Sequence, residues 1–402
     1  MYRDGKINEI GELEVVVDGI IYQLQAHGGI SRIFSEILPR MCGMDDSLHI
    51  TLLSEGELKQ SLPEHGRITH QTIPPVLRYL GPVFRYLRPR RVWKPVIPLA
   101  RRFVRRLWIG RGGGKIWHST YFTMPERWNG ASVVTVVDMV YERFPDLFVG
   151  PEEDQFKLKR DYDQFLTEKR GCVLAADAVL CISDTTRRDV QHFYSMNSDR
   201  LHVIPLACSD AFRQLEQRHE VFEASTRGPF LLYVGSRVHY KNFDGFLKAY
   251  NTWSGREEIA LVVVGGPWSA SEEGRLVELG IRDQVHLITD VGDETLCHLY
   301  NQAAAFVHPS LYEGFGIPLL EAMACGCPVV ASRIPSTREV GGEIPIYFEP
   351  TEVDDLLAAL DIAISEGRNS ERVQAGLERA KSYSWDRTAV QTLEVYRQIS
   401  GR

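Results

Sequence analysis

The sequence lacks several features that would place it in common protein classes. Its seven cysteines form neither a disulfide framework nor paired metal-binding knuckles, which fits a reducing cytoplasm best. No apolar run reaches the roughly 20 residues that cross a bilayer, and the first residues lack the apolar core of a signal peptide. The net charge of −7 argues against a generic nucleic-acid binder. We therefore expect a protein that is neither integral to a membrane nor secreted by that route.

The chain has no internal repeat, heptad array or low-complexity tract, and strand-like apolar segments alternate with helical patterns along nearly all of its 402 residues. The expected strands are residues 13–21, 49–53, 115–118, 133–137, 178–182 and 202–204 in the first half, and 230–235, 259–265, 285–288, 303–308, 328–330 and 346–348 in the second. Such alternation predicts parallel sheets wrapped by helices, with too many strands for one core. We expect an α/β protein of two Rossmann-like, doubly wound domains that face a central cleft. The polar stretch 206–228 joins them, so the domains are residues 1–207 and 208–384.

Two carboxylates, Glu313 and Glu321, stand in the otherwise apolar stretch HPSLYEGFGIPLLEAMACGCPVVAS. The local pattern is strand, glycine-rich turn, helix, strand, with Pro318 near the helix start and Gly326 closing it. Glu313 then lies in the turn and Glu321 in the first helical turn, at the carboxyl edge of a parallel sheet, where open α/β folds bind ligands.

Taken singly, Glu321 is an acid that complements the helix dipole and Glu313 is an exposed loop acid. Together with Gly314 and Gly316, which allow close approach to the backbone, they indicate carboxylates that accept hydrogen bonds from a polyhydroxylated ligand. Acids would repel a phosphate, so hydroxyl groups are the better targets.

Two cations, Arg237 and Lys241, follow a strand and precede a helix that begins near Phe243. This is either an anion site or a solvated basic turn. A glycine loop with Gly28 and Gly29 also follows a strand and opens a helix, but it is not the G-x-G-x-x-G fingerprint, so a nicotinamide cofactor is disfavoured. A phosphate binder in each half and a carboxylate pair for hydroxyls together indicate a nucleotide-sugar ligand.

The sequence resembles the retaining glycosyltransferases of family 4, which have the GT-B fold. The carboxylate stretch resembles that family's E-x7-E motif and YVGSRVHYKN its diphosphate-binding segment, while HGGISR, WHSTY and YSWDRTAVQTLEVY also match, so the resemblance runs from about residue 13 to 396. The segments GGISR, HSTYF and VDMVYERFP look most like mannosyltransferases of bacterial O-antigen and related polysaccharide synthesis. The resemblance implies a metal-independent transfer of a hexose from a nucleotide sugar to a saccharide or lipid-linked acceptor, with retention of anomeric configuration. Mannose from GDP-mannose is the best candidate for the donor. The resemblance also implies that a helix at 385–402 returns to the first domain.

The resemblance also implies roles for individual residues. Glu313 contacts the donor hexose, Glu321 holds the ribose, and Arg237 and Lys241 bind the diphosphate; the catalytic set is Glu313, Arg237, Lys241 and Asp138. The other substrate-binding positions are Gly28, Gly29, Ser236, Gly314, Phe315, Gly316 and Ile317, with Ile288 and Val291 beside the base and His118 as a further candidate.

One position departs from the family pattern. Many relatives carry a histidine before the aspartate of this strand end, whereas here Val137 precedes Asp138. His118 is a candidate replacement, although a histidine at a strand end is as often a hydrogen-bonded core residue.

Two sequence patterns resemble metal-binding motifs, but both are better explained without a metal. The D-x-D string at Asp161 and Asp163 lies in a polar, helical segment and indicates a surface charge run. Cys325 and Cys327 flank a helix end without a nearby histidine partner, which suits packing. We expect no cofactor and no metal.

Alternative functions have the same two-domain layout. A sugar-nucleotide epimerase or a phosphorylase shares it, but a phosphorylase needs a pyridoxal lysine site. A non-catalytic scaffold that binds nucleotide sugars is possible if Val137 marks lost activity.

The segment 78–115 contains twelve Arg and Lys residues and no acid, so the rest of the chain has a net charge of −7 − 12 = −19. Aromatic residues alternate with these charges, which favours attachment to an anionic membrane surface. A solvated basic face and a groove for an anionic acceptor are the alternatives, and nucleic acid is disfavoured. We expect a cytoplasmic protein, peripheral on the inner face of the membrane, where a lipid-linked acceptor would reach the cleft.

Overall fold

The structure, a computed structural model, describes residues 12–25, 28–73, 109, 112–147, 155–216 and 228–401. Most of the basic segment 78–115, and therefore the predicted membrane contact, lies outside these residues. No helix within the described ranges is both long and apolar enough to cross a membrane.

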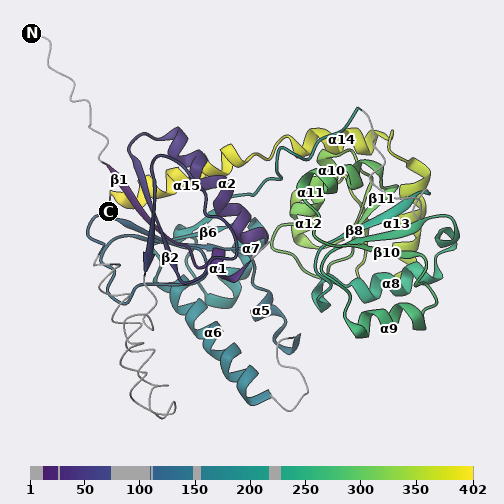
Figure 1. The fold of residues 1–402 in the computed structure, drawn as a ribbon, viewed down its shortest axis with the longest axis horizontal. Coiled ribbons are helices and arrows are strands. Elements are labelled where there is room, and N and C mark those ends of the chain that lie inside the picture. Colours follow the sequence, from purple (N-terminus) through teal and green to yellow (C-terminus); the bar gives the residue numbers. More distant parts are fainter. Residues whose placement is uncertain are drawn as a thin grey trace, which may run out of the picture.

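Two parallel sheets form the centres of two lobes that lie side by side (Figure 1). The first sheet has the strand order β3-β2-β1-β4-β5-β6-β7 and the second β10-β9-β8-β11-β12-β13. The first contains β1 (Leu13–Asp18), β2 (Leu48–Glu55), β3 (Ile68–Ile73), β4 (Ile116–Ser119), β5 (Ser132–Val136), β6 (Ala178–Cys181) and β7 (Leu201–Val203). The second contains β8 (Phe230–Val234), β9 (Ala260–Val264), β10 (Val285–Ile288), β11 (Ala305–His308), β12 (Val329–Ser332) and β13 (Ile346–Phe348).

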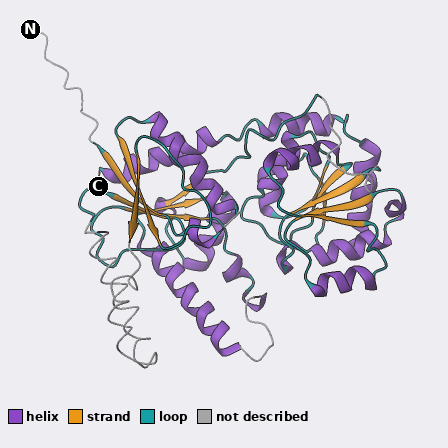
Figure 2. Cartoon of the chain, viewed as in Figure 1, coloured by secondary structure: helices purple, strands orange, loops and turns teal. Residues whose placement is uncertain are grey.

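Helices lie on both sides of each sheet (Figure 2), which confirms the prediction of two doubly wound domains. Those of the first domain are α1 (Ile21–Leu24), α2 (Gly29–Met44), α5 (Val140–Arg143), α6 (Gln155–Ala175) and α7 (Asp184–Tyr194). The second has α8 (Phe243–Thr252), α9 (Ala270–Glu278), α10 (Asp293–Gln302), α11 (Ile317–Ala324), α12 (Pro335–Gly341), α13 (Val353–Glu366) and α14 (Glu371–Ala380). The last helix is α15 (Trp385–Ser400).

Two strand predictions for the first sheet need correction. β3 was missed because it is an edge strand of mostly polar, solvated residues and buries only Ile73. The strand expected at 13–21 ends at Asp18, and Ile21 instead begins α1. A Cβ atom at Gly19 would lie 2.3 Å from the carbonyl oxygen of Leu53, so the chain turns out of the sheet at a residue without a side chain.

The last helix, α15, packs on the first domain against α2, and in Figure 1 it extends as the yellow helix from α14 across to that lobe. Thr388 donates a hydrogen bond of 2.7 Å to the carbonyl of Pro205, and Arg397 pairs with Asp45 at 2.9 Å. These contacts tie the end of the chain to the domain in which it begins.

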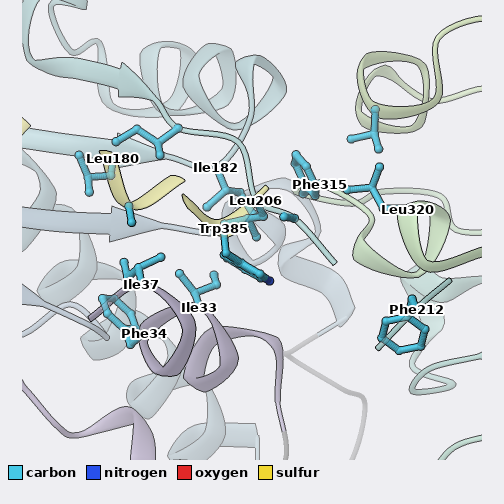
Figure 3. Packing of buried hydrophobic residues seen from close by; sticks show 14 of the residues in the cluster. Ile33, Phe34, Ile37, Leu180, Ile182, Leu206, Phe212, Phe315, Leu320 and Trp385 are labelled. Atoms are coloured by element: carbon cyan, nitrogen blue, oxygen red, sulfur yellow. The ribbon is translucent and has the colours of Figure 1, made fainter. Parts of the chain in front are cut away.

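One hydrophobic cluster extends from the first domain into the second. Figure 3 shows Trp385 of α15 among side chains of α2 and β6, with Phe315 and Leu320 of the second domain farther along. Because these side chains exclude water from both domains at once, the cluster supports the relative placement of the turn that carries Glu313.

Candidate active site

The turn between β11 and α11 presents the first predicted carboxylate. Gly316, with a φ of 108°, precedes α11, and Pro318 occupies its first turn. This confirms the predicted order of strand, glycine-rich turn, helix and strand. Glu321, however, is the fifth residue of α11 and so lies in its second turn, and the prediction that it lies in the first helical turn was wrong.

Glu313 is held by a preformed set of polar partners. Lys241 Nζ donates to both carboxylate oxygens at 2.7 and 2.9 Å, and Ser310 donates at 2.7 Å. His308 Nε2 lies 3.3 Å from Oε1. Burial by itself raises the pKa of Glu313, but the charge of Lys241 and the contact with His308 lower it well below its usual range. The turn therefore carries an ionised carboxylate beside an ammonium group.

Arg237 does not join this pair. Its guanidinium bonds to Glu272 at 2.5 Å and to the carbonyl of Pro267 at 2.9 Å, and it stacks 4.4 Å from the centre of the Trp268 ring. Within the described part of the chain, its buried Nη1 atom has no hydrogen-bond partner. A Cβ atom at Gly265 would come within 2.9 Å of that Nη1, so the glycine leaves room for it at the end of β9.

Glu321 is buried where the two domains meet. The hydroxyl of Tyr300 donates to it at 3.1 Å, and Arg32, from the first turn of α2, lies 3.5 Å away and also pairs with Asp293. Burial raises the pKa of Glu321 to about 7, and Arg32 and Tyr300 limit the rise. The sequence analysis did not single out Arg32, although its position in GGISR, one turn after the glycines, was a usable signal.

The glycine loop brings the start of α2 to the second domain. Gly28 has extended backbone and precedes α2, and its carbonyl accepts a hydrogen bond from Ser31 at 3.0 Å. A Cβ atom at Gly29 would meet nothing within 4 Å. The open backbone at Gly29 thus lies one helical turn from Arg32, which reaches Glu321.

Gly314 forms a close contact between the two domains. A Cβ atom there would lie 1.8 Å from the carbonyl oxygen of Val137 and 3.2 Å from Cβ of Asp138. The carbonyl of Gly314 accepts a hydrogen bond from Ser183 at 2.5 Å. Only glycine fits this position. The close approach of Gly314 to Val137 and Asp138 places Asp138 beside the turn that carries Glu313.

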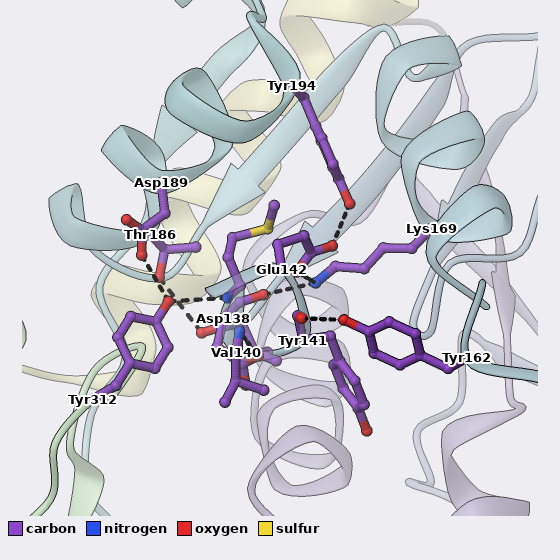
Figure 4. A network of polar contacts seen from close by, with 12 residues as sticks. Asp138, Val140, Tyr141, Glu142, Tyr162, Lys169, Thr186, Asp189, Tyr194 and Tyr312 are labelled. Atoms are coloured by element: carbon purple, nitrogen blue, oxygen red, sulfur yellow. Dashed lines mark hydrogen bonds and ion pairs between the residues drawn. The ribbon is translucent and has the colours of Figure 1, made fainter. Parts of the chain in front are cut away.

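The surroundings of Asp138 form a polar network (Figure 4). Burial raises the pKa of Asp138, Lys169 opposes the rise and Glu313 adds to it. Tyr312 accepts a hydrogen bond from the backbone N–H of Met139 at 3.0 Å. Asp138 and Glu313 are therefore close enough for their charges to interact across the two domains.

The remaining candidates occupy varied positions. Ile288 ends β10 and Val291 precedes α10, both half-buried against the core, and Ile317 begins α11. Ser236 is exposed, and its carbonyl accepts a hydrogen bond from Tyr233 at 2.6 Å. The ring of Phe315 is buried, so this residue can offer a ligand only its backbone.

The prediction that His118 contacts substrate was wrong. His118 is fully buried, and its two ring nitrogens lie 2.5 Å from the hydroxyl of Tyr396 and 2.8 Å from that of Thr135. Burial lowers the pKa of His118 to about 3, so the ring is neutral. The histidine joins α15 to the first sheet, as the alternative interpretation had it.

No group of three His, Cys, Asp or Glu side chains among the described residues could hold a metal ion. Asp161 and Asp163 lie on α6, where both are exposed.

The sequence and the fold were compared with those of known proteins, and both show similarity to glycosyl transferases. Residues 215–379 match the family described as "Glycosyl transferases group 1". The chain is 31% identical over 292 residues to O-antigen chain mannosyltransferase B of Escherichia coli, a match that covers 70% of this chain and 74% of that protein. It is 28% identical to O-antigen chain mannosyltransferase RfbU of Salmonella typhimurium, covering 69% and 71%. Among solved structures it resembles sucrose-phosphate synthase from Thermosynechococcus elongatus, with a TM-score of 0.74, 18% identity and coverage of 97% and 99%.

The two parallel sheets and their facing edges define the GT-B fold, as expected from the resemblance. The chain belongs to the group 1 glycosyl transferases, the family to which its sequence motifs had pointed.

Proposed function

We propose that the protein transfers mannose from GDP-mannose to a saccharide or lipid-linked acceptor, with retention of anomeric configuration, in the synthesis of bacterial surface polysaccharide. The observation that carries the proposal is the pairing of Glu313 with Lys241 on a turn that contacts Asp138. The names of the two O-antigen mannosyltransferases support the choice of sugar and pathway.

The chemistry needs positive charge where the leaving group departs. Breaking the bond between sugar and diphosphate leaves negative charge on the diphosphate, and preorganised cations stabilise it. Lys241 supplies an ammonium group, and the Nη1 atom of Arg237 is a buried N–H donor without a partner in the described structure. In this proposal Glu313 orients Lys241 and accepts hydrogen bonds from the hexose, and Glu321 accepts them from the ribose. No metal is assigned a role.

The test compares Glu313→Gln with Glu343→Gln, a matched change of an exposed acid that pairs with Arg338. Glu313→Gln should lower release of GDP from GDP-mannose by roughly 100-fold or more, because a charged group at the reacting centre is lost. Glu343→Gln should behave as the wild type. The anomeric configuration of the product is read by NMR.

Three results would count against the proposal. Near wild-type transfer by Glu313→Gln would make the turn carboxylate an ordinary loop acid. A wild-type protein that binds GDP but neither hydrolyses nor transfers the sugar would be a non-catalytic scaffold. Release of UDP from UDP-glucose, without release of GDP from GDP-mannose, would overturn the choice of donor.

We also propose that the basic segment 78–115 binds the anionic inner surface of the membrane and so brings the enzyme to a lipid-linked acceptor. Its charge supports this, since each basic residue near such a surface contributes about 1 kcal/mol. The protein should cosediment with vesicles that contain phosphatidylglycerol but not with phosphatidylcholine vesicles, and salt should weaken the binding. Replacing the four arginines of the stretch LARRFVRRLW with glutamine should reduce it, whereas equal binding to both vesicle types would exclude the idea.

A further inference from the structure

Five aromatic side chains in the first domain form a cluster that the site described above does not use. We call it the aromatic platform, and it consists of Tyr121, Phe122, Tyr141, Tyr162 and Phe165. Phe165 is its centre, with ring centroids 4.8 Å from Tyr141, 5.9 Å from Tyr121 and 6.1 Å from Phe122. All five side chains are half-buried, so each keeps part of its surface exposed. They come from the loop after β4, from α5 and from α6.

The aromatic platform adjoins the reacting centre. Tyr121 follows the carboxyl end of β4, and α5, which carries Tyr141, begins two residues after Asp138. Burial raises the pKa of both tyrosines, and the nearby charge of Asp138 adds to each rise. Gly314 in turn lies against Asp138. The aromatic platform is therefore on the first-domain side of the turn that holds Glu313.

A buried lysine, Lys169, connects part of the aromatic platform with Asp138, and Figure 4 shows it beside Asp138, Glu142 and Tyr141. Lys169 Nζ donates to Glu142 at 2.8 Å and to the backbone carbonyl of Asp138 at 3.1 Å. The same Nζ lies 5.1 Å from the ring centre of Phe122 and 5.9 Å from that of Tyr141. The hydroxyl of Tyr162 donates to the carbonyl of Tyr141 at 2.6 Å. Lys169 therefore links Phe122 and Tyr141 to the backbone of Asp138.

We propose that the aromatic platform binds a pyranose ring of the saccharide acceptor, with an acceptor hydroxyl directed toward Asp138. This rests on the proposed function. One face of a pyranose carries mainly C–H groups, which pack on the electron-rich face of an aromatic ring, while its hydroxyl groups seek polar partners at the edge. The carboxyl group of the half-buried Asp138 provides a hydrogen-bond acceptor at such an edge, and an alkyl chain has no donor for it. The half-exposed rings and the adjoining carboxylate thus fit a sugar better than a lipid tail.

The decisive variant is Phe165→Leu, which removes the central ring and keeps an apolar side chain. The matched control is Phe193→Leu, because Phe193 is also a half-buried phenylalanine of the first domain, on α7 and outside the platform. Binding of the methyl pyranosides of mannose, glucose, galactose and rhamnose is followed by saturation-transfer NMR in the presence of GDP, and affinity for GDP by calorimetry. If Phe165→Leu does not fold, Tyr121→Ala replaces it.

Phe165→Leu should weaken binding of the preferred pyranoside by roughly 10-fold while the affinity for GDP stays at the wild-type value, and Phe193→Leu should match the wild type throughout. The acceptor KM in transfer assays should rise to the same extent. Unchanged pyranoside binding in Phe165→Leu, an equal loss in Phe193→Leu, or no binding of any pyranoside by the wild type would overturn the proposal. With octyl α-mannoside, saturation of the alkyl protons instead of the ring protons would also overturn it in favour of a lipid site. Failure of the wild type to bind GDP would refute the proposed function separately.

Discussion

Replacing Glu321 with glutamine should change stability and nucleotide binding in opposite directions. The carboxyl is buried beside Tyr300 and Arg32, and its pKa rises from an ordinary 4.5 to about 7 because of burial. A group whose pKa is higher in the folded than in the unfolded state stabilises the fold at low pH, and this stability is lost as the pH rises through the folded value. The native protein should therefore lose stability between about pH 5 and about pH 8, because the carboxyl group ionises more readily in the unfolded chain than in the fold.

The size of this effect follows from the two pKa values. Between about pH 5.5 and about pH 8, ionisation of Glu321 should remove about 2 kcal/mol from the free energy of unfolding of the wild type. Glu321→Gln has no proton to lose, so its stability relative to the wild type should rise by that amount over this range. In the same variant, affinity for GDP should fall roughly tenfold or more, because an amide is a weaker acceptor than a carboxylate.

Urea unfolding of both proteins at the two pH values measures the first effect, and calorimetry with GDP the second. Because all other groups are shared, only the difference between the two proteins is compared. Arg32→Gln gives a second check: it removes a cation that lowers the pKa of Glu321, so the loss of stability should move to higher pH. A difference between Glu321→Gln and wild type that does not vary with pH would refute the reasoning, and unchanged GDP affinity would remove the ribose assignment.

Two further predictions concern a buried and a half-buried charge away from the donor. Lys169→Met should lower the free energy of unfolding by about 3–5 kcal/mol in urea, because Glu142 is left buried without its cation; a loss below about 1 kcal/mol would mean that Glu142 finds another partner. Glu339→Ala should cost about 1–3 kcal/mol, since its carboxylate accepts hydrogen bonds of 2.6 and 3.0 Å from two N–H groups at the start of α7. The exposed Glu343→Ala is its control, and equal melting temperatures of the two variants would contradict this role.

Much of the site was predictable because its parts are local. The apolar strand before Glu313, the glycines after it and the helix that follows occur within one short stretch, and the structure folds them as expected. Lys241 was recognised from its place after a strand end, but its pairing with Glu313 could not be read from spacing, because 72 positions separate the two residues. Arg237 was also recognised from its place after a strand end, but it does not pair with Glu313. It lies in the loop after β8, and its guanidinium bonds to Glu272 of α9.

The sequence by itself determined the alternation of strands and helices, the two-domain α/β class and the identity of the carboxylate turn, because these depend on hydrophobic periodicity and turn chemistry over a few residues. Tertiary structure alone decided which groups meet. It placed His118 against Tyr396 of the last helix, brought Arg32 to Glu321 across the two domains, and gathered the aromatic platform from three segments around Lys169. The physical reason is that burial and charge pairing depend on distances in space, and residues far apart in the chain acquire those distances only when the two sheets and their helices pack together.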